Sequence, residues 1–236
     1  TSHYYRSSFY TIAGTAGHKN MEAYLSDALA DKSMSLGSRI SGRGTVINAL
    51  LDWKQPERAA ALVPAQEAEI ATQPPSDRWS YYTNAFATAL GRLGDTARLN
   101  KLFADAPLPE NKAQILVAAA TGFFKADKPD VARPALDRAL EISAAIADPT
   151  IRSNTLQSIA SSQALLGNID GARKTYAQSS EVLKVKRPDL AGWVDYSVAT
   201  ALESTNAEGA TKLAQGIGDP FWRISALVRI AGSFVT

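Results

Sequence analysis

The chain has 236 residues, of which 45% are hydrophobic and 20% charged, so it can bury a core and is not a disordered tail. Its 25 Lys and Arg are spread among 23 Asp and Glu, and the net charge of +2 argues against a basic surface for nucleic acid. The absence of cysteine excludes disulfides, thiol nucleophiles and cysteine metal sites.

Turn signals divide the chain into six predicted helical hairpins and one further helix. Gly and Pro fall between segments whose apolar residues recur at three- and four-residue steps, and no segment keeps a two-residue alternation. The strongest break is the proline pair Pro74-Pro75, which cannot continue a helix. The expected hairpins span residues 4–31, 38–71, 77–104, 110–146, 148–185 and 188–216, and the final helix spans 219–234 of one repeat domain that covers 1–236.

A short marker recurs along the chain: an acidic residue followed two positions later by Ala. The intervals between successive acids are 38, 35, 40 and 38 residues. A period near 37 residues is typical of a helix-turn-helix unit. The marker pairs are Glu57/Ala59, Asp95/Ala97, Asp130/Ala132, Asp170/Ala172 and Glu208/Ala210.

A second repeated motif places Asp before Pro at two predicted helix starts, Asp148-Pro149 and Asp219-Pro220. The Asp side chain can cap free backbone N–H groups, and Pro is tolerated in the first turn. The same apolar spacing follows each motif, with Leu156, Ile159 and Ala160 after the first and Leu227, Ile230 and Ala231 after the second.

The fifth hairpin resembles a tetratricopeptide repeat (TPR). The matching positions are Leu156, Ile159, Ala160, Gln163, Gly167, Ala172 and Tyr176. The fourth hairpin is similar, with Asp127 in place of the turn glycine. The resemblance implies an all-α fold, a right-handed α-solenoid of about six antiparallel helix hairpins plus a terminal helix. It also implies a groove that binds a peptide, a partner protein or, less often, a small ligand.

Three clusters of aromatic residues and arginine begin predicted first helices. Trp, Tyr and Arg are the residue types that most often carry interface energy, so we take these clusters as candidates for partner binding. An alternative is that the aromatic rings pack between neighbouring hairpins while the arginines cap or pair locally. The candidates are Arg78, Trp79, Tyr82, Trp193, Tyr196, Trp222 and Arg223.

No catalytic or metal-binding pattern stands out. His18 and Glu22 lie four residues apart but lack a third metal ligand, and no Gly-x-Ser-x-Gly elbow is present. Asp195 and Glu203 are eight residues apart, roughly 12 Å along a helix, too far for a glycosidase pair. We therefore expect no catalytic residue, no metal, no cofactor and no enzymatic activity.

The leading interpretation is a non-catalytic scaffold or adaptor for a protein or peptide partner. Two alternatives are a helical accessory domain of a larger enzyme, such as a cell-wall lytic enzyme, and a superhelix that binds a small ligand or lipid. The final helix lacks a second helix after it, so Leu227, Ile230 and Phe234 either pack as a cap or lie open for assembly.

Two features of the sequence bear on location. No apolar run approaches the roughly 18 residues that a bilayer span requires, so we expect no membrane span. The lack of cysteine slightly favours an exported or periplasmic bacterial protein over a cytoplasmic one. The chain begins at Thr1 rather than Met, and we expect that a signal sequence, a tag or a further domain once preceded it.

Overall fold

The computed structural model describes residues 36–73, 81–183 and 207–233, together with 192–193, 195–197, 199–200 and 203. Across these residues the chain forms α-helices and no strand, which confirms the predicted all-α class and its antiparallel helix pairs. The predicted hairpin at 4–31 lies outside the described residues. The helices are α3 (Leu36–Asp52), α4 (Pro56–Thr72), α6 (Tyr81–Leu93), α7 (Thr96–Asp105), α8 (Pro109–Lys125), α9 (Pro129–Ser143), α10 (Pro149–Leu165), α11 (Ile169–Val182), α13 (Ala207–Gln215) and α14 (Pro220–Ser233).

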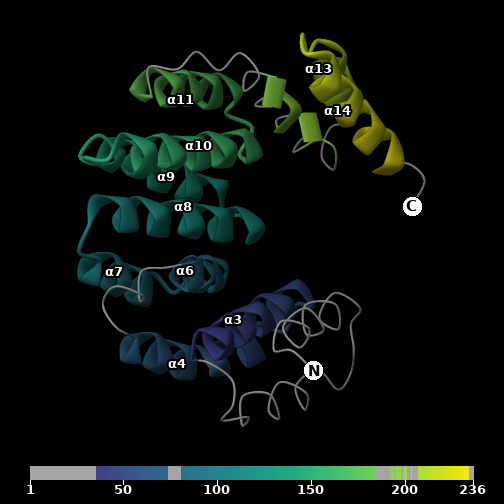
Figure 1. Cartoon of the computed structure of the whole chain (residues 1–236). Coiled ribbons are helices and arrows are strands. Elements are labelled where there is room, and N and C mark those ends of the chain that lie inside the picture. Colours follow the sequence, from purple (N-terminus) through teal and green to yellow (C-terminus); the bar gives the residue numbers. More distant parts are fainter. Residues whose placement is uncertain are drawn as a thin grey trace. The chain divides into compact units, whose positions relative to one another are not determined.

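The chain divides into two compact units. The first contains residues up to Ala106 together with Thr121–Asp127, and the second contains Pro107–Ala120 and the residues from Lys128 onward. In the first unit α3 packs against α4 and α6, and α6 packs against α7 (Figure 1). In the second unit α10 packs against α9 and α11, while α13 packs against α14.

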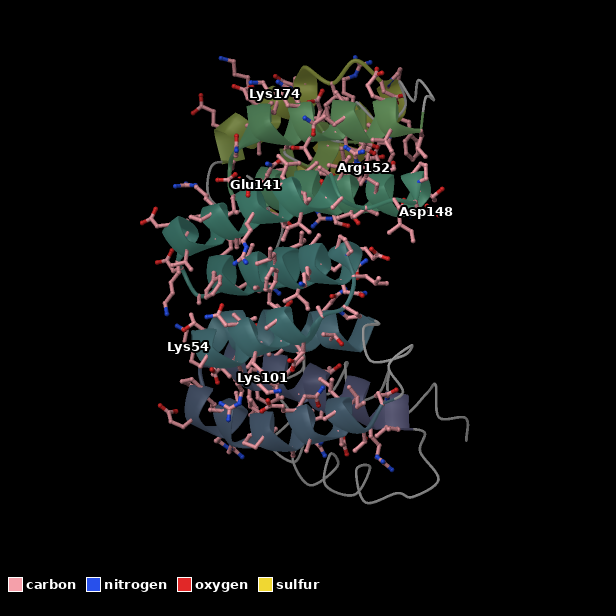
Figure 2. The ribbon with its side chains drawn as sticks, turned by 90° about the vertical axis from the view of Figure 1, so that its left-hand side faces the viewer. Lys54, Lys101, Glu141, Asp148, Arg152 and Lys174 are labelled. Carbon is pink, nitrogen blue, oxygen red and sulfur yellow. The ribbon has the colours of Figure 1, made fainter. Side chains whose placement is uncertain are left out.

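Both Asp-Pro motifs begin helices as the sequence predicts. The carboxylate of Asp148 accepts hydrogen bonds from two backbone N–H groups in the first turn of α10, at 2.8 and 2.9 Å. The carboxylate of Asp219 accepts the corresponding bonds in α14, at 2.9 and 3.1 Å. Figure 2 shows Asp148 at the start of its helix. These caps satisfy N–H groups that have no partner within the helix.

A left-handed residue closes each of four hairpin turns. Lys54, Gly94, Asp127 and Gly167 have φ values of 57°, 72°, 58° and 76°. In the turns at Lys54, Gly94 and Gly167, the next residue donates its backbone N–H five positions back, as in the Schellman motif. Asp127 thus adopts the conformation of the glycine that it replaces in the repeat pattern.

The second helix of each described hairpin buries its fourth residue. In the third hairpin this observation corrects the sequence marker, because Asp95 caps α7 and Ala97 is exposed. Leu99 takes the buried position there, so the first two intervals of the repeat are 40 and 33 residues rather than 38 and 35. The buried residues are Ala59, Leu99, Ala132, Ala172 and Ala210.

Small residues allow the helices to approach closely. A Cβ added to Gly122 of α8 would overlap the carbonyl oxygen of Thr88 in α6 and lie 3.0 Å from Gly91 Cα. In the second unit, Ala160 and Ala172 bring α10 against α11 in a core with Tyr176. The same two helices share a buried hydrogen bond of 2.8 Å between the hydroxyls of Ser153 and Ser179.

Candidate interaction surfaces

Four of the seven predicted partner-binding residues lie in the described part of the second unit. The Trp193 ring packs against Tyr176 with 5.9 Å between ring centroids. The Tyr196 ring packs against Trp222 with 5.2 Å between centroids. All four residues, including Arg223, are half-buried. Arg78, Trp79 and the side chain of Tyr82 lie outside the described residues.

Tyr196 contacts α14 through a side-chain hydrogen bond as well as through its ring. A hydrogen bond with Tyr196 is the main cause that raises the pKa of Arg229, and Glu203 adds an ion pair at 3.5 Å. Gly192 permits this packing, because a Cβ there would lie 2.7 Å from Cδ1 of Trp222. The aromatic residues therefore pack within the unit, and contact between their exposed parts and a partner stays a prediction.

A cleft of about 280 Å³ is lined in part by Asp195, which lies between Trp193 and Tyr196 in the sequence. Arg173 of α11 forms one wall and donates to Oδ1 of Asp195 from Nη2 at 2.7 Å and from Nε at 3.0 Å. Helix α13 forms the opposite wall through Gly209, Lys212, Leu213 and Gly216.

One of the two cations in this cleft has an ion-pair partner among the described residues, and the other has none. Arg173 and Asp195 neutralise each other, whereas Lys212 is exposed and forms no ion pair with any described residue. Leu213, which is half-buried, supplies an apolar part of the wall in the same cleft as Lys212. Since an ammonium group binds carboxylates through charge-assisted hydrogen bonds, the cleft suits an acidic side chain next to an apolar one.

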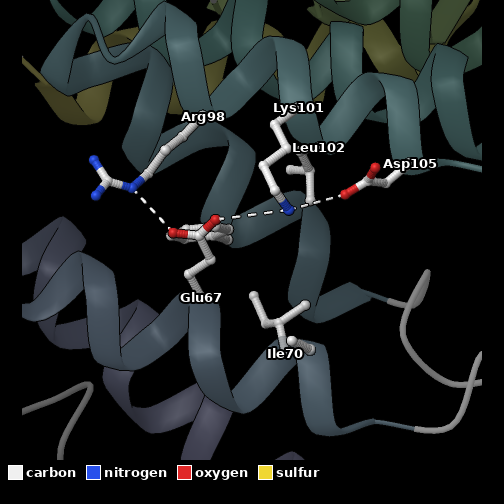
Figure 3. Close-up of a pocket in the computed structure, with 8 residues that line it drawn as sticks. Glu67, Ile70, Arg98, Lys101, Leu102 and Asp105 are labelled. Atoms are coloured by element: carbon white, nitrogen blue, oxygen red, sulfur yellow. Dashed lines mark hydrogen bonds and ion pairs between the residues drawn. The ribbon is translucent and has the colours of Figure 1, made fainter.

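The first unit has a smaller groove between α4 and α7, with a volume of about 80 Å³ (Figure 3). Glu67 lies between two cations, with Oε2 at 3.1 Å from Arg98 Nε and Oε1 at 4.0 Å from Lys101 Nζ. Lys101 also approaches Asp105 at 3.0 Å. The groove is lined by Glu67, Ile70, Ala71, Phe86, Arg98, Lys101, Leu102 and Asp105.

The ionic groups of this groove hold one another. Burial acts to raise the pKa of Asp95 next to the groove, but hydrogen bonds and the charge from Arg98 outweigh burial and lower it. Hydrogen bonds with Asp95 and Glu67 raise the pKa of Arg98 in turn. The charged side chains of this groove pair with one another, so we expect it to bind an ionic ligand less well than the cleft at Lys212 does.

The size of both hollows bears on what they can hold. Pockets for small molecules and cofactors usually occupy about 300–1,000 Å³, and the two volumes fall below that range. A groove of about 80 Å³ has room for a single side chain, and one of about 280 Å³ for a few. Side chains of a macromolecular partner fit these dimensions better than a cofactor does.

Among the residues that line the cleft, only Asp195 was considered from the sequence, as a carboxylate too far from Glu203 for a glycosidase pair. Arg173 and Lys212 each follow an acid-x-Ala marker within four residues, at the start of a second helix. A cation three or four residues after the marker acid was a signal available in the sequence. The proximity of α11, Asp195 and α13 in the cleft could not be predicted from the sequence, because it brings together residues up to about 40 positions apart.

Comparison with known proteins finds no match, whether to a family model, to a curated protein or to a solved structure. Among the described residues, no group of three or more His, Asp or Glu side chains has the arrangement of a metal site. Within that part of the chain, too, every helix is too short or too polar to cross a bilayer.

Proposed function

We propose that the chain is a non-catalytic interaction scaffold whose helix pairs stack into a right-handed, TPR-like α-solenoid. Its cleft at Arg173, Asp195 and Lys212 takes an acidic segment of a partner protein. The observation that carries this proposal is the cleft itself, in which a cation without an ion-pair partner among the described residues lies beside an apolar wall.

Two further features of the cleft support a protein partner. The Arg173–Asp195 pair is half-exposed and held at 2.7 Å, so it presents a fixed polar edge to an incoming chain. Trp193 and Tyr196 flank Asp195 in sequence and keep part of their surface exposed. If a bound segment reaches these rings, they would add contact area with little loss of conformational entropy.

The volume of the cleft favours a peptide over the alternative of a small ligand. At about 280 Å³ it lies just below the range that small-molecule pockets occupy. The accessory-domain alternative concerns parts of a gene beyond these residues, and it would leave the cleft with the same chemistry.

A peptide panel tests the proposal. We would measure binding of three labelled peptides of equal length by the full chain: one acidic and apolar, one basic and apolar, and one neutral. The acidic peptide should bind best, and Lys212→Glu should weaken its binding about tenfold or more because the cation becomes a like charge. Raising the salt concentration should also weaken binding.

Lys174→Glu is the matched control for this experiment. Lys174 is exposed on the same unit but does not line the cleft, and Figure 2 shows its place on α11. This variant makes the same change of charge, so it should bind the acidic peptide like the parent. Equal losses in both variants, or no preference for the acidic peptide, would count against the cleft.

A further inference from the structure

One face of α14 is apolar and uncovered. Phe221, Ile224 and Val228 have exposed fractions of 66%, 60% and 66%, and Ala231 and Gly232 beside them are also exposed. At about 100° per residue these five positions fall within roughly 100° of the helix circumference. We call this face the α14 stripe. It carries no charged residue.

The opposite face of α14 packs against the rest of the second unit. Ile230 and Ala226 are buried in a core with α13, and Trp222 and Leu227 pack against it. From the sequence, Leu227, Ile230 and Phe234 were expected either to pack as a cap or to lie open, and Phe234 lies outside the described residues. Leu227 and Ile230 can be compared with that expectation. They pack, and the open residues are those of the α14 stripe on the other side of the helix.

Helix α10 shows what normally lies against such a face. Aligning the caps Asp148 and Asp219 places Ile224, Val228 and Ala231 level with Ser153, Gln157 and Ala160. In α10 those three residues face the antiparallel helix α11. The described contacts are the 2.8 Å Ser153–Ser179 bond, a 3.3 Å bond from Gln157 to Ser179, and packing of Ala160 on Ala172.

The chemistry of the α14 stripe specifies its occupant. The Ser153 hydroxyl and the Gln157 amide of α10 form hydrogen bonds with Ser179 of α11. The α14 stripe has no polar side chain, so a helix that covers it should present an apolar, uncharged face. Among the described helices, α14 itself carries such a face uncovered. We propose that the α14 stripe docks antiparallel against the α14 stripe of a second copy of this chain, independently of the cleft at Lys212.

The order of residues along the stripe matches an antiparallel pair. A two-fold axis level with Ala226 sets Ile224 opposite Val228 of the other copy and Phe221 opposite Ala231. The bulky end of one stripe thus meets the small end of the other, as close packing requires. A parallel pair would set Phe221 against Phe221 and leave a gap between the two Ala231 residues.

The area of contact sets the expected strength. Three large side chains from each copy bury on the order of several hundred Å² in total, below the roughly 1,200 Å² of a standard stable interface. The dimer should therefore be weak, with a Kd in the micromolar range, and it should dissociate on dilution.

Sedimentation equilibrium of the full chain tests the association. The parent should move from monomer to dimer with rising concentration, and Ile224→Glu should weaken association at least tenfold without changing the helical signal. Val131→Glu is the matched control, because Val131 is 45% exposed on α9 and lies outside the α14 stripe. A parent that stays monomeric up to about 1 mM, or an Ile224→Glu variant that still dimerises, would overturn the proposal.

Single cysteines test the antiparallel register, since the chain has none of its own. A mixture of Ile224→Cys and Val228→Cys proteins should form disulfide-linked dimers under mild oxidation faster than either variant alone. Faster cross-linking of each variant with itself would indicate a parallel pair and overturn the antiparallel arrangement. A partner protein in place of a second copy would leave both variants uncross-linked.

Discussion

At the scale of single residues, each of four hairpin turns contains a residue with a left-handed backbone, a conformation that a Cβ atom disfavours sterically. The left-handed region raises the conformational free energy of a residue with a Cβ by roughly 1–2 kcal/mol, and that of glycine hardly at all. Two of the four turns use glycine, and the other two use Lys54 and Asp127. Asp tolerates the left-handed region better than Lys does, so Lys54 should be the more strained of the two.

We therefore expect Lys54→Gly to raise the free energy of unfolding by about 0.5–1 kcal/mol. Gly167→Ala should lower it by about 1 kcal/mol through the backbone alone, because a Cβ at Gly167 would meet no atom of the described part of the chain within 4 Å. Chemical denaturation of both variants measures the two changes. Shifts of the same sign in both would contradict a shared left-handed turn.

Asp95 gives the first unit a dependence on pH. Arg98 lowers the pKa of Asp95 below its ordinary 3.8, so the folded state favours the carboxylate. A lowered folded pKa stabilises the protein above the unfolded value, and this stability disappears as the pH falls below about 4.

Asp95→Asn isolates this contribution, since Asn can still cap α7. At neutral pH the variant should be less stable than the parent by up to about 1 kcal/mol, in keeping with a partly exposed ion pair. Denaturation at pH 7 and at pH 3 should show the difference shrinking in acid. A difference that is constant or grows in acid would exclude the ion pair as its source.

At the scale of helices, close approach depends on single glycines. Gly122 of α8 lies against the backbone of α6, where a Cβ has no space. Gly122→Ala should therefore lower the free energy of unfolding by about 2–3 kcal/mol, because backbone atoms must move apart.

Gly42 in α3 provides the control for Gly122. A Cβ there would meet no described residue within 4 Å, so Gly42→Ala should raise stability by about 0.5–1 kcal/mol through helix propensity. Thermal melts of the two variants should move in opposite directions. A destabilised Gly42→Ala together with a neutral Gly122→Ala would refute the packing described for α6 and α8.

Local chemistry explains which helices were predictable from the sequence. The starts of α10 and α14 follow from Asp and Pro in the first turn, which act within a few residues. The turn before α7 was predicted, but the acid-x-Ala marker there is out of step with the other repeats, because Leu99 rather than Ala97 takes the buried position. That choice depends on packing between helices, which a short sequence pattern does not contain.

At the scale of the whole molecule, the candidate cleft was not predictable. Trp193 and Tyr196 were singled out by residue type, and the structure packs both against neighbouring rings. Arg173 and Lys212 drew no attention, because each is an ordinary helix-surface cation until α11 and α13 bring them to one hollow. The sequence thus identified the neighbourhood of the cleft but not its charged walls.

The central proposal is that the chain is a scaffold whose helix pairs stack stepwise, one on the next. Small-angle X-ray scattering tests it most directly, using the Ile224→Glu variant so that self-association does not contribute. A compact domain of this length has a radius of gyration of about 18 Å. We predict a value clearly above that, because a row of stacked hairpins is longer than it is wide. A radius of gyration of about 18 Å would mean a closed bundle and contradict the scaffold.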